Sequence, residues 1–153
     1  MSTRVHPEAK IAADLLFPAM SLFSRLTCYG SVIPKGLTPQ QVKIIMELDV
    51  TGSCRLSALS RCAAVTHGTM TVAVQKLLKK GLLTKTKDLK DERAVSLKLT
   101  AAGKKLAEDT KAKTVDLFNV ICNELSAAER RKFAESYQFL VNAYKTVVSK
   151  KGA

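Results

Sequence analysis

The side chains that could carry chemistry in this sequence are mostly cationic or hydroxylic, and few are of the catalytic kind. Histidine occurs only at positions 6 and 67. Cys54, Cys62 and His67 lie near one another along the chain, but their spacing matches no known zinc pattern. The sequence contains no recognisable nucleophile with its base, paired carboxylates or phosphate-binding glycine loop. We therefore expect no enzyme, no metal and no cofactor, and turn to binding.

The charge indicates a polyanionic partner. The 153 residues include 25 Lys+Arg and 13 Asp+Glu, and the resulting net charge of +12 exceeds what solubility requires. Residues 76–105 alone hold ten basic and three acidic residues. No segment combines lysine-rich and aromatic faces or reaches ~18 consecutive apolar residues, so we expect no membrane association. The N-terminus lacks a signal-peptide pattern, which predicts a cytoplasmic protein whose four cysteines are thiols.

Two short helices joined by a tight turn would position the binding side chains. Ser57 is the predicted N-cap of the first helix and Thr66 that of the second, which runs from about His67 to Lys80 and ends at Gly81. One face of the second helix is apolar. The opposite face is small, polar and basic, which suits a DNA major groove. It carries Gly68, Thr69, Val72, Gln75, Lys76 and Lys79.

A charged hairpin follows these helices. Residues 82–87 and 94–99 are strand-like, and in the second run Val95, Leu97 and Leu99 alternate with polar residues. A hairpin directly after a two-helix turn is typical of a winged helix, whose tip reaches a DNA backbone or minor groove. The predicted wing side chains are Lys85, Lys87, Lys90, Asp91 and Arg93.

The remaining chain is predicted to be helical. Thr38, Thr100 and Ser126 each precede a helical pattern as N-caps, and Gln41 and Glu129 complete capping boxes. In the first segment, residues 6–29, Pro18 predicts a kink or a split. The last helix repeats large apolar residues at coiled-coil spacing. These are Phe133, Tyr137, Leu140, Tyr144 and Val147.

Together these patterns predict a mostly α (α+β) protein, a winged helix-turn-helix with long N- and C-terminal dimerisation helices. The DNA-binding lobe would span 37–100, within a single domain of residues 1–153. The helical dimerisation region would span 1–30 and 101–153, because these segments carry more apolar surface than a small winged helix covers. A homodimer would place two recognition helices for a pseudo-palindromic site with half-sites ~10 base pairs apart.

Four motifs in register resemble the MarR family of bacterial regulators over nearly the whole chain. They are Leu37-Thr38-x-x-Gln41, Leu77-x-x-Lys80-Gly81-Leu82, Asp91-x-Arg93 and Leu99-Thr100-x-x-Gly103. The resemblance implies a dimer with interlocking terminal helices and a wing arginine, here Arg93, that enters the minor groove while Asp91 orients it. It also implies an effector, either a small aromatic or anionic ligand between the dimer helices and the DNA-binding lobe or an oxidant of a cysteine. Cys28 is the cysteine to test.

Two positions depart from the family pattern. Glu92 stands where a second arginine is common, so one phosphate contact is lost. Val72 stands where arginine is frequent, and a valine can contact a thymine methyl but cannot bind guanine bidentately. The best base-edge candidates are Thr69, Gln75 and Lys76. The expected phosphate contacts are Ser57, Thr66, Lys79, Lys85, Lys87 and Lys90, although capping alone would also explain Thr66.

We expect a sequence-specific, DNA-binding transcriptional regulator that acts as a homodimeric repressor and is released by a small-molecule or redox effector. Two alternatives remain open. The winged helix could dock on a protein partner, or it could bind duplex DNA architecturally without sequence preference.

Overall fold

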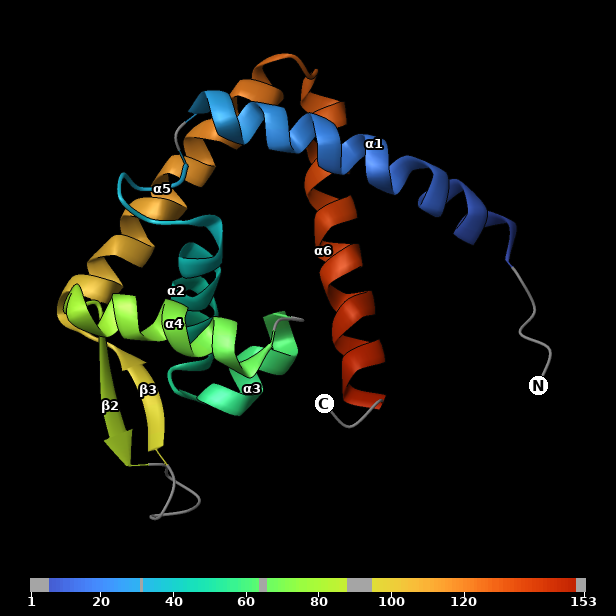
Figure 1. Ribbon diagram of the computed structural model, residues 1–153. Helices are drawn as coiled ribbons and strands as arrows, with labels where there is room; N and C mark the ends of the chain where they lie inside the picture. The colour runs from blue at the N-terminus through green and yellow to red at the C-terminus, as the bar shows by residue number, and fades with distance from the viewer. Residues whose placement is uncertain (1–5, 31, 64–65, 88–94, 151–153) are drawn as a thin grey trace. The chain divides into compact units, whose positions relative to one another are not determined.

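The computed structural model describes residues 6–30, 32–63, 66–87 and 95–150. It confirms a mostly helical fold with one small antiparallel sheet, in the order expected of a winged helix (Figure 1). The chain divides into two compact units between Thr114 and Val115. The elements are α1 (Pro7–Gly30), α2 (Pro39–Thr51), β1 (Cys54–Arg55), α3 (Leu56–Ala63), α4 (His67–Lys79), β2 (Leu83–Lys87), β3 (Val95–Leu99), α5 (Ala101–Asn123) and α6 (Ala127–Lys150).

Helix α2 begins and ends where its sequence predicts. The Gln41 N–H donates to the Thr38 hydroxyl at 3.3 Å, and the Thr38 N–H donates to the Gln41 side-chain oxygen at 3.0 Å. This capping box satisfies N–H groups that the first turn leaves unpaired. Gly52, with a φ of 74°, ends the helix and donates its N–H to the Leu48 carbonyl.

The helix-turn-helix is formed by α3 and α4. Thr66 caps α4 as predicted, since its hydroxyl accepts from the Thr69 N–H at 3.2 Å. Gly81, with a φ of 68°, follows the helix. The cap predicted at Ser57 is wrong, because α3 already begins at Leu56. Pairing of β1 with β3 extends to Arg55, so the chain passes from strand to helix before it reaches Ser57.

The sheet has the order β1-β3-β2, with both neighbours antiparallel to β3. Leu97 and Leu99 are buried as predicted, but the simple alternation is wrong at the start of β3, where Val95 is exposed and Ser96 is buried. Ser96 lies in the central strand between β1 and β2. The neighbouring strands therefore cover it, an effect that the pattern along one strand does not contain.

One hydrophobic core joins the helices and the sheet of the first unit. Its largest fully buried side chains come from α2, α3 and α4, and β2, β3 and the start of α5 complete it with Leu83, Leu97, Leu99 and Ala107. The most deeply buried large side chains, each at most 2% exposed, are Ile44, Ile45, Leu48, Leu59, Met70 and Leu77.

The junction between β3 and α5 is tightly fitted. The Thr100 hydroxyl donates to the Gly81 carbonyl at 2.7 Å, and the Thr100 N–H donates to the Leu82 carbonyl at 3.1 Å. The same hydroxyl accepts from the Gly103 N–H and caps α5 as predicted. A Cβ at Gly103 would lie 2.1 Å from the Leu82 oxygen, so only glycine fits this close approach.

Helix α1 runs through Pro18 for 24 residues, so the chain does not split there, and the kink stays a prediction. A proline removes only one N–H donor from a helix, which a helix of this length can lose. Most large apolar side chains of α1 are exposed, among them Ile11, Leu15, Phe17 and Leu22.

In the second unit, the last turns of α5 lead into α6. The Glu129 carboxylate accepts from the Ser126 N–H at 2.9 Å and from its hydroxyl at 2.7 Å, which confirms the predicted start of α6. Arg130 donates to the Leu125 carbonyl at 2.7 Å. Ring contacts join the two helices, with centroids 6.0 Å apart for Phe118–Phe133 and 5.5 Å apart for Phe118–Tyr137.

Candidate nucleic-acid interface

Helix α4 has one buried and one exposed face, as predicted. Met70 and Leu77 are fully buried and Val74 is 5% exposed, so the core holds the helix along its length. The residues of the predicted binding face lie on the opposite side of the helix and are all exposed. They are Gly68, Thr69, Val72, Gln75, Lys76 and Lys79. The core therefore presents these six positions to a partner on a helix that packing holds in place.

The threonines at the start of α4 bond within their own helix. The Thr66 and Thr69 hydroxyls lie 2.9 Å apart and share a hydrogen bond. The Thr71 hydroxyl donates to the His67 carbonyl at 2.8 Å. The capping role of Thr66 is thus observed, while its phosphate contact remains a prediction. Ser57 is exposed in the first turn of α3, and its phosphate contact also remains a prediction.

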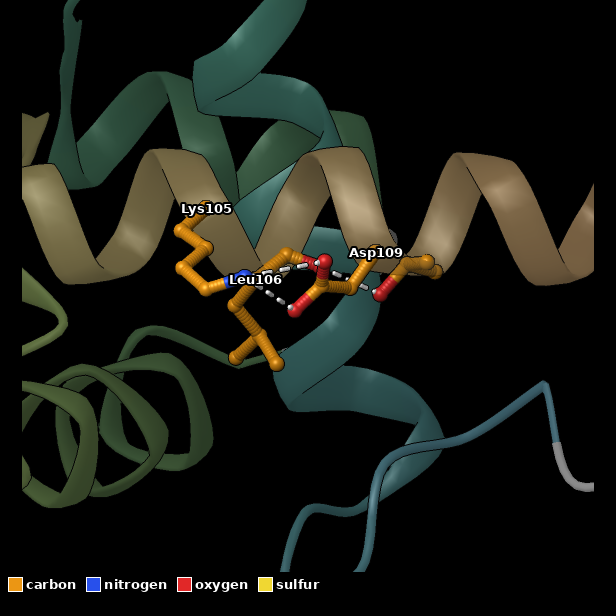
Figure 2. A network of polar contacts seen from close by, with 4 residues as sticks. Lys105, Leu106 and Asp109 are labelled. Carbon is orange, nitrogen blue, oxygen red and sulfur yellow. Dashed lines mark hydrogen bonds and ion pairs between the residues drawn. The ribbon is translucent and has the colours of Figure 1, made fainter.

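Lys76 and Lys79 at the end of α4 differ from Lys105 and Lys111 on α5, each of which has an acidic partner. Lys105 lies 3.4 Å from both carboxylate oxygens of Asp109, next to the bond from the Thr110 hydroxyl to the Leu106 carbonyl (Figure 2). Lys111 pairs with Asp49. Within the described residues, Lys76 and Lys79 form no ion pair, so their charges stay available to an anionic partner.

The wing is described along its two strands. Lys85 is exposed in β2 opposite Leu97, and Lys87 ends β2 opposite Val95, although the structure does not describe the Lys87 side chain. Lys90, Asp91, Glu92 and Arg93 lie outside the described residues. Their roles at the wing tip remain predictions.

A small apolar cavity adjoins the exposed face of α4. Its volume is about 230 Å³, and residues from α3, α4 and both wing strands line it. Sequence reasoning missed this cavity, because its walls come from segments that are distant along the chain and no local pattern marks it. The lining residues are Leu56, Thr71, Val74, Gln75, Leu78, Lys85, Val95 and Leu97.

The described residues contain no group of three His, Cys, Asp or Glu side chains that could hold a metal ion. His67 is exposed at the start of α4. The side chains of Cys28 and Cys62 are not described, so the redox role considered for Cys28 remains untested. In the same described part of the chain, every helix is too short or too polar to cross a membrane.

A helix-turn-helix followed by a two-stranded wing, with an exposed polar and basic second helix, defines a winged-helix DNA-binding protein. The model of the MarR family matches residues 37–95. The SarZ regulator of Staphylococcus saprophyticus is 29% identical over 101 residues, which cover 66% of this chain and 68% of SarZ. The MdtR repressor of Bacillus subtilis is 26% identical over 96 residues, which cover 61% of this chain and 62% of MdtR.

A solved MarR transcriptional regulator from Methanosarcina mazei Go1 superposes with a TM-score of 0.68 at 25% identity, covering 88% of this chain and 99% of that one. The DNA-binding region of this chain, residues 37–95, matches the MarR family, and its relatives identify the chain as a DNA-binding transcriptional regulator. The family and these relatives are regulators rather than enzymes.

Proposed function

We propose that this regulator is a homodimeric repressor that binds a pseudo-palindromic operator and leaves it when an effector binds. The observation that carries the proposal is the exposed face of α4, where Lys76 and Lys79 have no acidic partner among the described residues and the two-stranded wing follows directly. The name of MdtR as a repressor supports the direction of regulation.

Each predicted site residue has a part in this proposal. Thr69, Val72, Gln75 and Lys76 face the base edges of the major groove, where sequence is read. Arg93 enters the minor groove, and Asp91 holds its guanidinium in place. The phosphate contacts come from Ser57, Thr66, Lys79, Lys85, Lys87 and Lys90.

The test is the affinity for an operator selected from a random duplex library. Arg93→Ala should weaken binding by about 1–3 kcal/mol, and the logarithm of the affinity should fall steeply with the logarithm of the salt concentration. Lys43→Ala, which removes one charge from an exposed position of α2 outside the predicted DNA contacts and the dimerisation helices, is the matched control. An affinity for the operator that changes neither with the salt concentration nor with the Arg93→Ala substitution would contradict the proposal.

The same experiment separates the alternatives. A protein-interaction module would not comigrate with a duplex pool in size-exclusion chromatography. An architectural DNA binder would comigrate but would show equal affinity for every duplex in the selection. The proposal requires both comigration and enrichment of one sequence.

The dimer is supported by apolar surface on α6. Tyr137, Leu140, Tyr144 and Val147 are 46%, 43%, 59% and 50% exposed in the single chain, and they follow the coiled-coil spacing of the sequence. An apolar stripe of this length on a single chain is typical of an interface with another chain. A second copy of the chain would cover this stripe and would supply the two-fold symmetry that a pseudo-palindromic operator has.

The cavity beside α4 supports a small-molecule effector, although it lies within the DNA-binding lobe and not between the lobe and the dimer helices, where the resemblance places the ligand. Its walls are almost entirely apolar, and Lys85 offers a cation to an anionic group at its edge. Release from the operator by benzoate, unchanged in Cys28→Ser, is the result expected of a small-molecule effector. Release by hydrogen peroxide that Cys28→Ser abolishes would assign the regulation to the thiol instead.

A further inference from the structure

The first turns of α4 expose no formal charge. The helix runs from His67 to Lys79, and its first lysine is Lys76. In helix-turn-helix proteins the N-terminal residues of the recognition helix contact the base edges. Bidentate recognition of guanine needs an arginine or a lysine. The stretch of α4 from His67 to Gln75 therefore lacks the side chains that bind guanine bidentately.

The hydroxyl groups on these turns are already engaged. Thr69 shares its hydroxyl bond with Thr66, and Thr71 donates to the His67 carbonyl. Gly68 has no side chain, and a Cβ there would meet no atom within 4 Å. Only one of the Thr66 and Thr69 hydroxyls donates in their shared bond, so the other keeps its proton, and among the described residues Val72 is the one exposed apolar side chain on these turns.

Val72 stands out on this face. It is 53% exposed, so it contributes little to the core that Met70 and Val74 form on the other side of the helix. Valine is also a poorer helix former than alanine, because its branched Cβ restricts the side chain against the preceding turn. Other valines of the chain are as exposed, among them Val50 and Val120, but Val72 differs from them because it lies on the predicted base-reading face of α4.

Thymine is the base that a valine on this face fits. Among the four bases, thymine alone presents an apolar group, its 5-methyl, in the major groove. Gln75 is exposed on the next turn of the same face and offers the amide that pairs bidentately with adenine. Side chains three positions apart on a helix are neighbours, so the two can contact nearby base pairs.

We propose that Val72 is a specificity-determining residue that packs on one thymine 5-methyl group in each half-site, while Gln75 reads an adenine beside it. At these two base pairs, recognition then comes from methyl burial and one amide, while Thr69 and Lys76 remain the other base-edge residues of the proposed function. The inference rests on the proposed operator binding and narrows it to half-sites with A·T pairs opposite Val72 and Gln75.

The test replaces each thymine of the selected operator, one at a time, with deoxyuridine, which removes only the 5-methyl group. At one symmetric position the change should weaken binding by about fourfold in each half-site, the value expected from the burial of one methyl group. Substitution at other thymines should have a smaller effect. The readout is a fluorescence-anisotropy titration of the full-length protein.

The assignment to Val72 comes from a double-substitution cycle. Val72→Ala should bind the thymine operator about as weakly as the wild type binds the deoxyuridine operator, and it should lose its sensitivity to deoxyuridine at that position. Val72→Thr keeps one methyl group and should retain part of that sensitivity. Val50→Ala, at a valine on α2 that is 81% exposed, is the control and should behave as the wild type.

The outcomes separate the role of Val72 from operator binding itself. The role of Val72 would be overturned if operator binding depended on salt but did not change with any deoxyuridine substitution. It would also be overturned if the Val72→Ala protein were as sensitive to deoxyuridine as the wild type, and operator binding would stand in both cases. An absence of salt-dependent binding to any duplex would overturn operator binding itself. Circular dichroism checks that the exposed Val72→Ala change leaves the helices folded.

Discussion

The lobe around α4 and the helix α6 differ in where their apolar side chains end up. In the lobe, Ile45, Met70 and Leu77 are at most 1% exposed. In α6, all 24 of whose residues are described, none is buried, and Phe139 is 76% exposed. The lobe completes its core within one chain. The same kind of periodic apolar pattern in α6 leaves a surface that a second chain would cover.

Local sequence does not cause this difference. Helices α2 and α6 both begin with a complete capping box, Thr38 with Gln41 and Ser126 with Glu129. Both helices therefore start equally well. What separates them is burial, since α2 places Ile44 in the core of the first unit and α6 has no buried residue. Four changes test the comparison.

The largest effect is expected in the lobe core. Leu77→Ala should lower the free energy of unfolding by about 2–5 kcal/mol, because it removes a fully buried side chain and leaves a cavity. The control Leu140→Ala removes the same atoms from a side chain that is 43% exposed. Urea unfolding at a concentration where the protein is monomeric should show a much smaller loss for the control, and equal losses would contradict the comparison.

The next effect concerns association. Leu140→Glu should raise the dissociation constant of the dimer by about tenfold or more, since each leucine buried in an interface contributes about 1.5–3 kcal/mol. Asn142→Glu adds the same charge at an exposed polar position of α6 and should leave the dimer intact. Analytical ultracentrifugation measures both. A dimer unaffected by Leu140→Glu would mean that α6 is not part of the interface.

A smaller effect separates the two capping boxes. Thr38→Ala should lower the stability of the whole lobe by about 1 kcal/mol, because α2 unfolds together with the core. Ser126→Ala should instead act locally and speed amide hydrogen exchange in the first turns of α6 at monomeric concentrations. Hydrogen exchange followed by mass spectrometry distinguishes them. A global change from Ser126→Ala would show that α6 and the lobe unfold together.

The smallest effect depends on pH. Hydrogen bonds from the Ser126 hydroxyl and N–H hold the pKa of Glu129 below its usual value of 4.5. Because the folded pKa is the lower one, this stabilisation is complete above about pH 4.5 and is lost as the pH falls through the lowered pKa. Hydrogen exchange at the start of α6 should therefore gain a protection step on raising the pH. Glu129→Gln, which does not titrate, should lack that step.

Much of the fold was predictable because helix starts depend on neighbouring residues. Thr38, Thr66, Thr100 and Ser126 each bond to an N–H three residues later, and each was recognised from the sequence. The exposed face of α4 followed from helical spacing alone. The roles of the wing-tip residues rest on the family resemblance, and the structure does not describe them.

The errors have a different origin. The strand that pairs up to Arg55 moved the start of α3 ahead of Ser57, and the central position of β3 buried Ser96 against the alternation. Both effects come from pairing between strands that are distant in the sequence. A prediction made from a few neighbouring residues does not include such pairing.

The sequence alone determined the two wing strands, the caps at Thr38, Thr66, Thr100 and Ser126 and the face of α4 that carries Val72 and Gln75, because hydrogen bonds and periodicity over a few residues decide these features. Only the tertiary structure decided which apolar stripes are buried, how closely Gly103 approaches Leu82 and where a cavity opens beside α4. Those features depend on contacts between segments distant along the chain, which bury one stripe completely and leave an equally regular one exposed.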